Sequence, residues 1–229
     1  MPPTKVILFR EDDGRVPLLD WLDGPPSRVV AKCVVRLERF AELGHELRRP
    51  EGDYLGEGIY EIRFASRSVN FRMLYFYQGQ AVAVVSHGFT KERRVPATGD
   101  HCSSPPEAPV RGGPGAPHPS GTLMTPQSSA TTDAIRILHR RYVEGRPERL
   151  AELDEERAHA EIARAILELR KQAGLTQREL AERVGTTASV ICRLEDADYE
   201  GHSLSMLRRV ASALGQRIEL RFVAVGEGA

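Results

Sequence analysis

The sequence predicts two domains of different fold class: an α+β domain with an antiparallel sheet and two helices, and a mainly α domain with a helix-turn-helix and a C-terminal strand. Apolar and polar residues alternate with period 2 within residues 59–94, which is typical of half-buried strands. Apolar residues recur at three- and four-residue steps within residues 158–214, which is typical of packed helices. Between them, residues 98–131 are rich in Pro, Gly and Ser and too poor in large apolar side chains to offset ordering entropy. We therefore expect domains at residues 1–97 and 132–229, joined by a disordered linker.

The composition limits the class of protein. A chain of 229 residues can form one large or two small domains, and its 32 basic and 32 acidic residues give no net charge. The whole molecule is therefore not a general polyanion binder, although local patches survive this average. The three cysteines are far apart without metal-ligand spacing, which favours a reducing cytoplasm. We find no apolar run that suits a membrane span and no secretion leader, so no membrane partner is expected.

The first domain is expected to begin with a strand at residues 5–9 and a short helix at residues 17–23, where Pro17 suits the first turn. Residues 27–43 form the clearest helix of this half, which Gly44 ends. Its apolar residues fall at helical spacing, and its basic residues are interpreted as an ordinary solvated face; these are Arg28, Lys32, Arg36 and Arg39. A Gly-rich loop then leads into the sheet.

The sheet of the first domain is expected to be a three-stranded meander, with strands near residues 59–64, 69–77 and 81–89. Glu92 is the only acid within residues 62–94, whereas six side chains there are basic: Arg63, Arg67, Arg72, Lys91, Arg93 and Arg94. A small sheet that collects arginines in this way predicts a surface that holds a polyanion.

The second domain is expected to be helical. Residues 133–156 read as one or two helices broken near Gly145, and a further striped helix follows up to Gly174. Thr176 with Glu179 forms a capping box for the next helix. Gly185 ends that helix, and further helices begin near residues 187 and 203. The alternation in residues 217–225 predicts a closing strand.

The segment from Gln177 to Leu194 has the spacing of a helix-turn-helix, with a small residue where the helices cross, Gly185 at the turn and two buried aliphatic residues. Residues 158–214 resemble the phage-repressor, or XRE, type of this motif. The resemblance implies that the helix beginning near Thr187 lies in the major groove of operator DNA. It also implies phosphate contact by Gln177, and base or phosphate contacts by Thr187, Ala188, Ser189 and Arg193. The alternative is a helix-turn-helix kept for protein contacts alone.

The first domain also resembles a known family. The phrases IYEIRF, NFRMLYFY and VVSHGFTK are similar to the HigB-type toxins of the RelE/ParE superfamily, over about residues 5–95. The phrases AGLTQRELAERVG and RLEDADYEGHSL are similar to HigA-type antitoxins. Toxin followed by antitoxin is also the gene order of HigBA systems. The chain thus resembles a toxin fused to its antitoxin.

The resemblance implies an endoribonuclease that cuts messenger RNA on the ribosome without a metal or other cofactor. Arg63 and Arg72 would clamp the phosphate, and His87 would transfer protons, since imidazole can do so near neutral pH. Lys91 would hold the leaving oxygen or the RNA backbone, and Phe89 or Tyr75 could stack on a base, although a core position is the favoured interpretation of Tyr75. The remaining basic residues would contact RNA: Arg67, Arg93 and Arg94.

The resemblance also implies partners and a form of regulation. The antitoxin half would restrain the toxin half through a contact within one chain or between chains, and would bind operator DNA as a homodimer. The helical segment at residues 133–156 could cover the sheet, or the whole inhibitor could make the complex too bulky for the ribosome. Two other functions remain: a transcriptional regulator with an inactive toxin-like domain, and a ParE-like gyrase poison.

Overall fold

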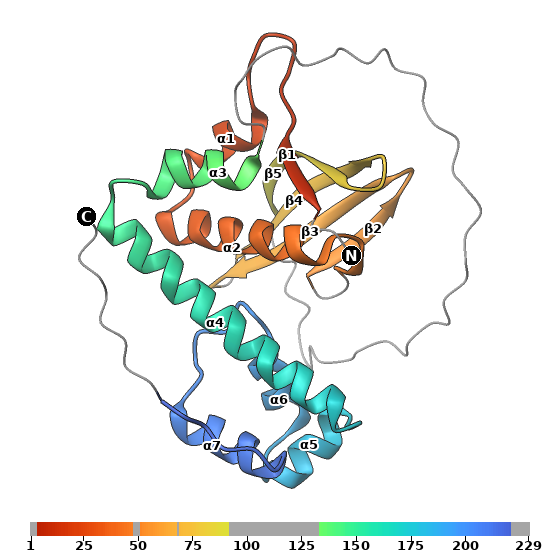
Figure 1. The fold of residues 1–229 in the computed structure, drawn as a ribbon, viewed down its shortest axis with the longest axis vertical. Helices are drawn as coiled ribbons and strands as arrows, with labels where there is room; N and C mark the ends of the chain where they lie inside the picture. Colours follow the sequence, from red (N-terminus) through yellow and green to blue (C-terminus); the bar gives the residue numbers. More distant parts are fainter. Residues whose placement is uncertain (1–3, 48–50, 68, 92–132, 221–229) are drawn as a thin grey trace. The chain divides into compact units, whose positions relative to one another are not determined.

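The computed structural model describes residues 4–47, 51–67, 69–91 and 133–220. These residues form two compact units, one made of residues 4–91 and 133–157 and the other of residues 158–220 (Figure 1). The predicted linker lies outside the described residues, as do Arg93 and Arg94. No helix of the described part of the chain is long and apolar enough to cross a membrane.

The first unit has the α+β architecture that the sequence predicts. Its helices α1 and α2 match the predicted segments closely, and η1 is a short 3-10 turn after Gly44. The elements before the gap are β1 (Lys5–Leu8), α1 (Pro17–Leu22), α2 (Ser27–Leu43), η1 (Gly44–Glu46), β2 (Gly52–Gly56), β3 (Ile59–Ser66), β4 (Val69–Gln78) and β5 (Val82–Lys91).

The sheet is larger than the predicted meander. Its strand order is β1-β5-β4-β3-β2, and β1 runs parallel to β5 while the other neighbours are antiparallel. The sheet is therefore mixed. The edge strand β2 forms where we expected a Gly-rich loop, because Gly52 to Gly56 finds a partner in β3 despite its low strand propensity.

One side of the sheet packs on α1 and α2. The Cys33 Sγ lies 3.2 Å from the Met73 Sδ, and the rings of Phe40 and Tyr75 lie 4.4 Å apart. A Cβ added at Gly88 would lie 2.2 Å from Trp21, so glycine lets α1 rest directly on β5. Tyr75 is 3% exposed in this core, so the prediction that it could stack on RNA is wrong.

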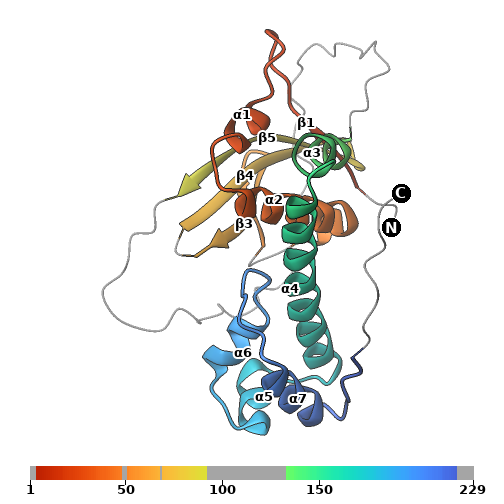
Figure 2. The ribbon, with the colours of Figure 1, turned by 90° about the vertical axis from the view of Figure 1, so that its left-hand side faces the viewer.

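Residues 133–157 form a second helical layer over α1 and α2 (Figure 2). This segment contains α3 (Ala134–Leu138), the π-helical turn η2 (His139–Val143) and the start of α4 (Pro147–Gln172). The predicted break is confirmed at Gly145, whose φ is +73°. Beyond it, α4 is one helix where we expected a new one near residue 158, because no Gly or Pro interrupts residues 148–172.

This second layer changes the environment of the basic residues on α2. Lys32 is 2% and Arg36 4% exposed, so the interpretation of these residues as a solvated face is wrong for both. For Lys32 the reason is residues 133–157, which supply Glu156, whereas Arg36 pairs with Glu51 in the segment before β2. Segments outside α2 therefore supply the charged partners of both residues.

The second unit contains the predicted helix-turn-helix, formed by α5 (Gln177–Val184) and α6 (Ala188–Leu194), with α7 (Leu204–Ala213) packed beside it. The capping box of Thr176 and Glu179 is confirmed, and Gly185 takes the left-handed conformation with φ +71°. Ser203 caps α7 through the amide of Met206. Residues 216–220 form no strand, and the rest of the predicted closing strand lies outside the described residues.

Candidate functional site

The side of the sheet opposite α1 and α2 brings together most of the basic residues that the sequence singles out. Strand register places Arg63 beside Arg72 and Arg72 beside Phe89. On the same face, two residues along each strand in one direction, Leu74 pairs with His87. Two residues in the other direction, Asn70 pairs with Lys91, so the Arg72 row lies between these two pairs. We call this surface the open face. Residues 133–157 lie on the other side of the sheet, so the prediction that they could cover this surface is wrong.

Two carboxylates hold the arginines of the open face. The Arg63 Nη2 lies 2.6 Å from the Asp53 Oδ2 and 2.5 Å from the Glu61 Oε1. The Arg72 Nε lies 3.4 Å from the other Glu61 oxygen. The side chain of Glu61 is 7% exposed, against 27% for Arg63 and 14% for Arg72. The arginines are thus oriented and partly neutralised, and each retains some exposed surface.

Neither carboxylate was predicted from the sequence as part of this site. Glu61 stands on the polar side of the alternation in β3, so the pattern could have placed it beside Arg63. Asp53 could not be placed, because β2 was not recognised as a strand. The basic surface is therefore less positive than a count of residues 62–94 suggests.

The other predicted residues of this site differ in position. His87 is exposed, with its Nδ1 3.1 Å from the Ser86 Oγ and its ring 6.1 Å from that of Phe89. Lys91 is exposed at the end of β5. Arg67 lies in the turn after β3 with φ +56°, away from the Arg63 row. Within the described ranges, no group of three His, Cys, Asp or Glu is arranged to hold a metal ion.

The helix-turn-helix presents a second surface. Thr187, Ser189 and Arg193 are exposed at α6, and Ala188 is half-buried. Gln177 instead donates a hydrogen bond of 2.9 Å from its Nε2 to the Glu195 Oε2.

Glu195 joins three parts of the helix-turn-helix unit. Its side chain is 4% exposed and accepts two hydrogen bonds from Arg170 at the end of α4, besides the one from Gln177 at the start of α5. The Arg170 Nη1 also donates to the carbonyl of Leu175, 2.7 Å away. Because charge-assisted, bidentate bonds fix geometry, this network holds α6 against its neighbours.

Comparison with known proteins supports the division into these two surfaces. Residues 20–100 match the family of phage-derived Gp49-like proteins, and residues 148–222 match a helix-turn-helix domain family. The chain is 49% identical over 65 residues to an uncharacterized HTH-type transcriptional regulator from Methanothermobacter thermautotrophicus. That match covers 28% of this chain and 93% of the relative. The chain therefore belongs to the HTH-type transcriptional regulators, and it joins an XRE-type helix-turn-helix to a Gp49-like domain of the RelE-like toxin kind.

Proposed function

We propose that the chain is a toxin–antitoxin fusion of the HigBA type. Residues 1–97 would form a HigB-like endoribonuclease that cuts messenger RNA on the ribosome, and residues 132–229 a HigA-like antitoxin that represses its own operon. The observation that carries the proposal is the open face, where a Gp49-like domain gathers Arg63, Arg72, His87 and Lys91. We place this activity in the cytoplasm, where ribosomes and operator DNA are present.

The proposed reaction is attack of a ribose 2′-hydroxyl on the adjacent phosphate. A bond forms between the 2′-oxygen and phosphorus, the bond to the 5′-oxygen breaks, and the products are a 2′,3′-cyclic phosphate and a 5′-hydroxyl. Arg63 and Arg72 would stabilise the charge of the phosphorane, since fixed cationic donors act best where charge develops. His87 would accept or return the proton, and Lys91 would stabilise the leaving oxygen or the RNA backbone.

The carboxylates fit this proposal as orienting groups. Asp53 and Glu61 hold the Arg63 guanidinium from two sides, so it need not be ordered when RNA binds. Phe89 is half-buried next to Arg72 and would stack on a base. Arg67, Arg93 and Arg94 remain proposed RNA contacts outside the Arg63 row.

A fragment of residues 1–97, expressed under tight induction beside the full chain, tests the enzyme. We expect the fragment to arrest growth and to create new 5′ ends only in translated messages, while the full chain stays silent. Circular dichroism must first show that the fragment is folded, because it lacks the helical layer of residues 133–157. A folded, soluble fragment that leaves growth and messages unchanged would contradict the proposal.

A transcriptional regulator with an inactive toxin-like domain is the second candidate. The observation that favours it is the neutralisation of Arg63 by two carboxylates, which leaves less charge for RNA. Under this alternative, Arg63→Ala and Arg72→Ala would change nothing in an activity assay, whereas substitutions in α6 would still abolish repression.

The DNA-binding surface is proposed to be α6, with Thr187, Ala188, Ser189 and Arg193 facing the major groove of an operator bound by a homodimer. Gln177 would reach a phosphate by exchanging its hydrogen bond to Glu195 for one to the phosphate. We expect Arg193→Ala to weaken binding of the chain's own promoter DNA by about 1–3 kcal/mol and to relax its sequence preference. Arg217→Ala, which removes an exposed arginine beyond α7, is the control. Unchanged operator affinity of Arg193→Ala, with an unchanged preference for operator over random DNA, would contradict this placement.

A further inference from the structure

We infer that residues 133–157, the docking segment, are recognised by α1 and α2 through a charge code, a set of ion pairs with Lys32 and Glu156 buried among them, that selects one partner sequence. The surface of α1 and α2 is called the docking surface. The inference concerns how the two parts of the chain pair, and it holds whether or not the open face cleaves RNA. All the contacts involved lie within the first unit.

The first element of the code is a carboxylate of the segment between two cations of the surface. The Glu156 Oε2 lies 2.9 Å from the Lys32 Nζ, and its Oε1 accepts a hydrogen bond of 2.9 Å from the Arg28 Nε. Lys32 and Glu156 are each only 2% exposed. One turn earlier on α4, the Glu152 Oε1 accepts a hydrogen bond of 2.8 Å from the Ser27 hydroxyl. This end of the surface therefore requires an acidic helix face.

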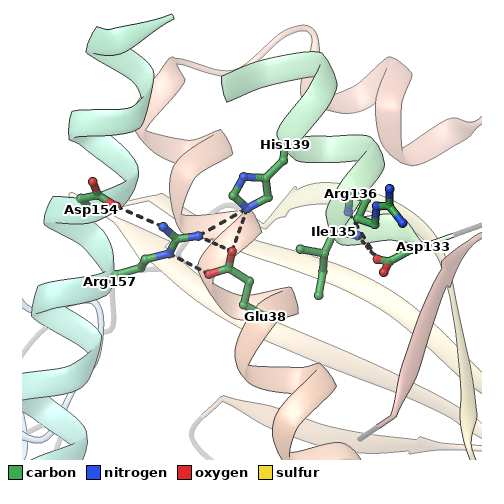
Figure 3. A network of polar contacts seen from close by, with 7 residues as sticks. All are labelled: Glu38, Asp133, Ile135, Arg136, His139, Asp154 and Arg157. Atoms are coloured by element: carbon green, nitrogen blue, oxygen red, sulfur yellow. Dashed lines mark hydrogen bonds and ion pairs between the residues drawn. The ribbon is translucent and has the colours of Figure 1, made fainter. Parts of the chain in front are cut away.

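The second element has the opposite sign. Glu38 of the surface accepts bonds from Arg157 to both its oxygens, at 2.6 and 3.0 Å, and its Oε1 lies 2.8 Å from the His139 Nε2 (Figure 3). Asp154 orients the Arg157 guanidinium from 3.0 Å away. Burial opposes ionisation of Glu38, but the hydrogen bonds from Arg157 and His139 outweigh it and hold its pKa below the ordinary value. In Figure 3, Asp133 caps α3 through the amides of Ile135 and Arg136, which fixes the start of the segment.

The third element anchors the segment to α1. The Tyr142 hydroxyl donates to the Leu19 carbonyl at 3.0 Å or to the Asp23 Oδ1 at 2.8 Å, and Arg141 pairs with the same carboxylate. Leu138 and Leu153 of the segment are fully buried, so apolar contact contributes to its affinity.

The positions of positive and negative residues support selective recognition of the docking segment rather than nonspecific binding. A buried ion pair adds little net stability, whereas a buried charge that loses its partner is strongly destabilising. A segment without an acid at position 156 would take from Lys32 the carboxylate that lies 2.9 Å away, and one without a cation at position 157 would take from Glu38 both bonds to Arg157 and leave it His139. The docking surface therefore fits a helix with adjacent acidic and basic residues in this register, and it rejects apolar helices that would otherwise bind.

The test uses the full chain with a protease site inserted within residues 98–131. After cleavage, the dissociation constant of the two pieces is measured from their co-elution on dilution. We expect Glu156→Lys to weaken the pairing at least about 100-fold, because it removes the carboxylate between Lys32 and Arg28 and places a third cation beside them. Lys32→Glu combined with Glu156→Lys should recover part of this loss, because it restores an ion pair between the two positions but not the bond from Arg28. Glu161→Lys is the matched control, because it makes the same substitution at an exposed position of the same helix.

Pairing that is unaffected by Glu156→Lys, or a double variant no tighter than the single variants predict by addition, would overturn the inference. Should Glu156→Lys unfold the uncut chain, Arg157→Glu provides a second cycle at a position 34% exposed. Its expected loss is about 10-fold, recovered by Glu38→Arg, and absence of recovery there also overturns the inference. Because the experiment measures binding of the two pieces, its result does not depend on whether the open face cleaves RNA.

Discussion

The two sides of the sheet use the same kinds of charged residue in different ways. On the side covered by α2 and residues 133–157, Lys32 and Glu156 are almost fully buried and satisfy each other across the layer. On the open face, Arg63 and Arg72 share Glu61 while each keeps part of its guanidinium exposed. The buried charges thus help to determine the structure, whereas the partly exposed arginines remain accessible to a ligand.

The open face should show the largest functional effect. We expect Arg72→Ala to lower messenger cleavage about 100- to 1,000-fold, because removing one donor to a developing negative charge costs about 3–4 kcal/mol of transition-state stabilisation. Cleavage by the fragment of residues 1–97 in a translating extract measures this, with Gln78→Ala at the exposed end of β4 as the control. Unchanged cleavage by Arg72→Ala would show that the exposed arginines of the open face do not act on RNA, contrary to the comparison drawn above.

Substitutions on the covered side of the sheet should change the stability of the protein. We expect Gly88→Ala to lower the free energy of unfolding by about 1–3 kcal/mol, because the new methyl group would overlap Trp21. Urea denaturation measures the loss. Thr90→Ala, two residues along β5 at an exposed position, should change it far less. A Gly88→Ala protein as stable as the parent would show that α1 is not packed tightly on the sheet.

A smaller effect is expected at the hydroxyl that joins the second helical layer to α1. Tyr142→Phe keeps the buried ring and removes the bonds to Leu19 and Asp23, so the free energy of unfolding should fall by about 1 kcal/mol. Tyr54→Phe removes the hydroxyl of an exposed tyrosine, which accepts a bond of 3.3 Å from the Gly58 amide, and serves as the solvent-exposed comparison. Equal effects of the two substitutions would indicate that the layer rests on apolar contact alone.

The smallest effect should be the change in the free energy of unfolding with pH. The pKa values of Glu38 and Asp23 are lowered in the folded protein by their bonds to Arg157 and Arg141, with His139 and Tyr142 contributing, in spite of burial. A lowered pKa adds stability above the unfolded value, about 4.3 for Glu and 3.9 for Asp, and that stability disappears as the pH falls through the folded value. We expect this contribution to be constant from pH 6 to 8 and to decline below about pH 4. Glu38→Gln should remove part of the decline in acid unfolding curves.

The sequence predicted most of the helix-turn-helix but less of the sheet. Thr176, Glu179 and Gly185 define their helix ends through local bonds, so a short stretch of sequence was sufficient. The partners of Arg63 and Lys32 were not predictable in this way. Asp53 lies in a strand with little strand propensity, and Glu156 meets Lys32 from a segment more than one hundred positions away. Long-range pairing is absent from local patterns, and the roles of the open-face residues stay predictions.

The parallel pairing of β1 with β5 also has a consequence for synthesis. The first strand cannot complete its pairing until Val85 has left the ribosome, and the covering layer is complete only with Arg157. At about 5–20 residues per second, several seconds separate these two events. During that interval the sheet of a new chain would be complete while its covering segment is still being translated. A covering segment could then come only from a chain that was completed earlier in the same cell.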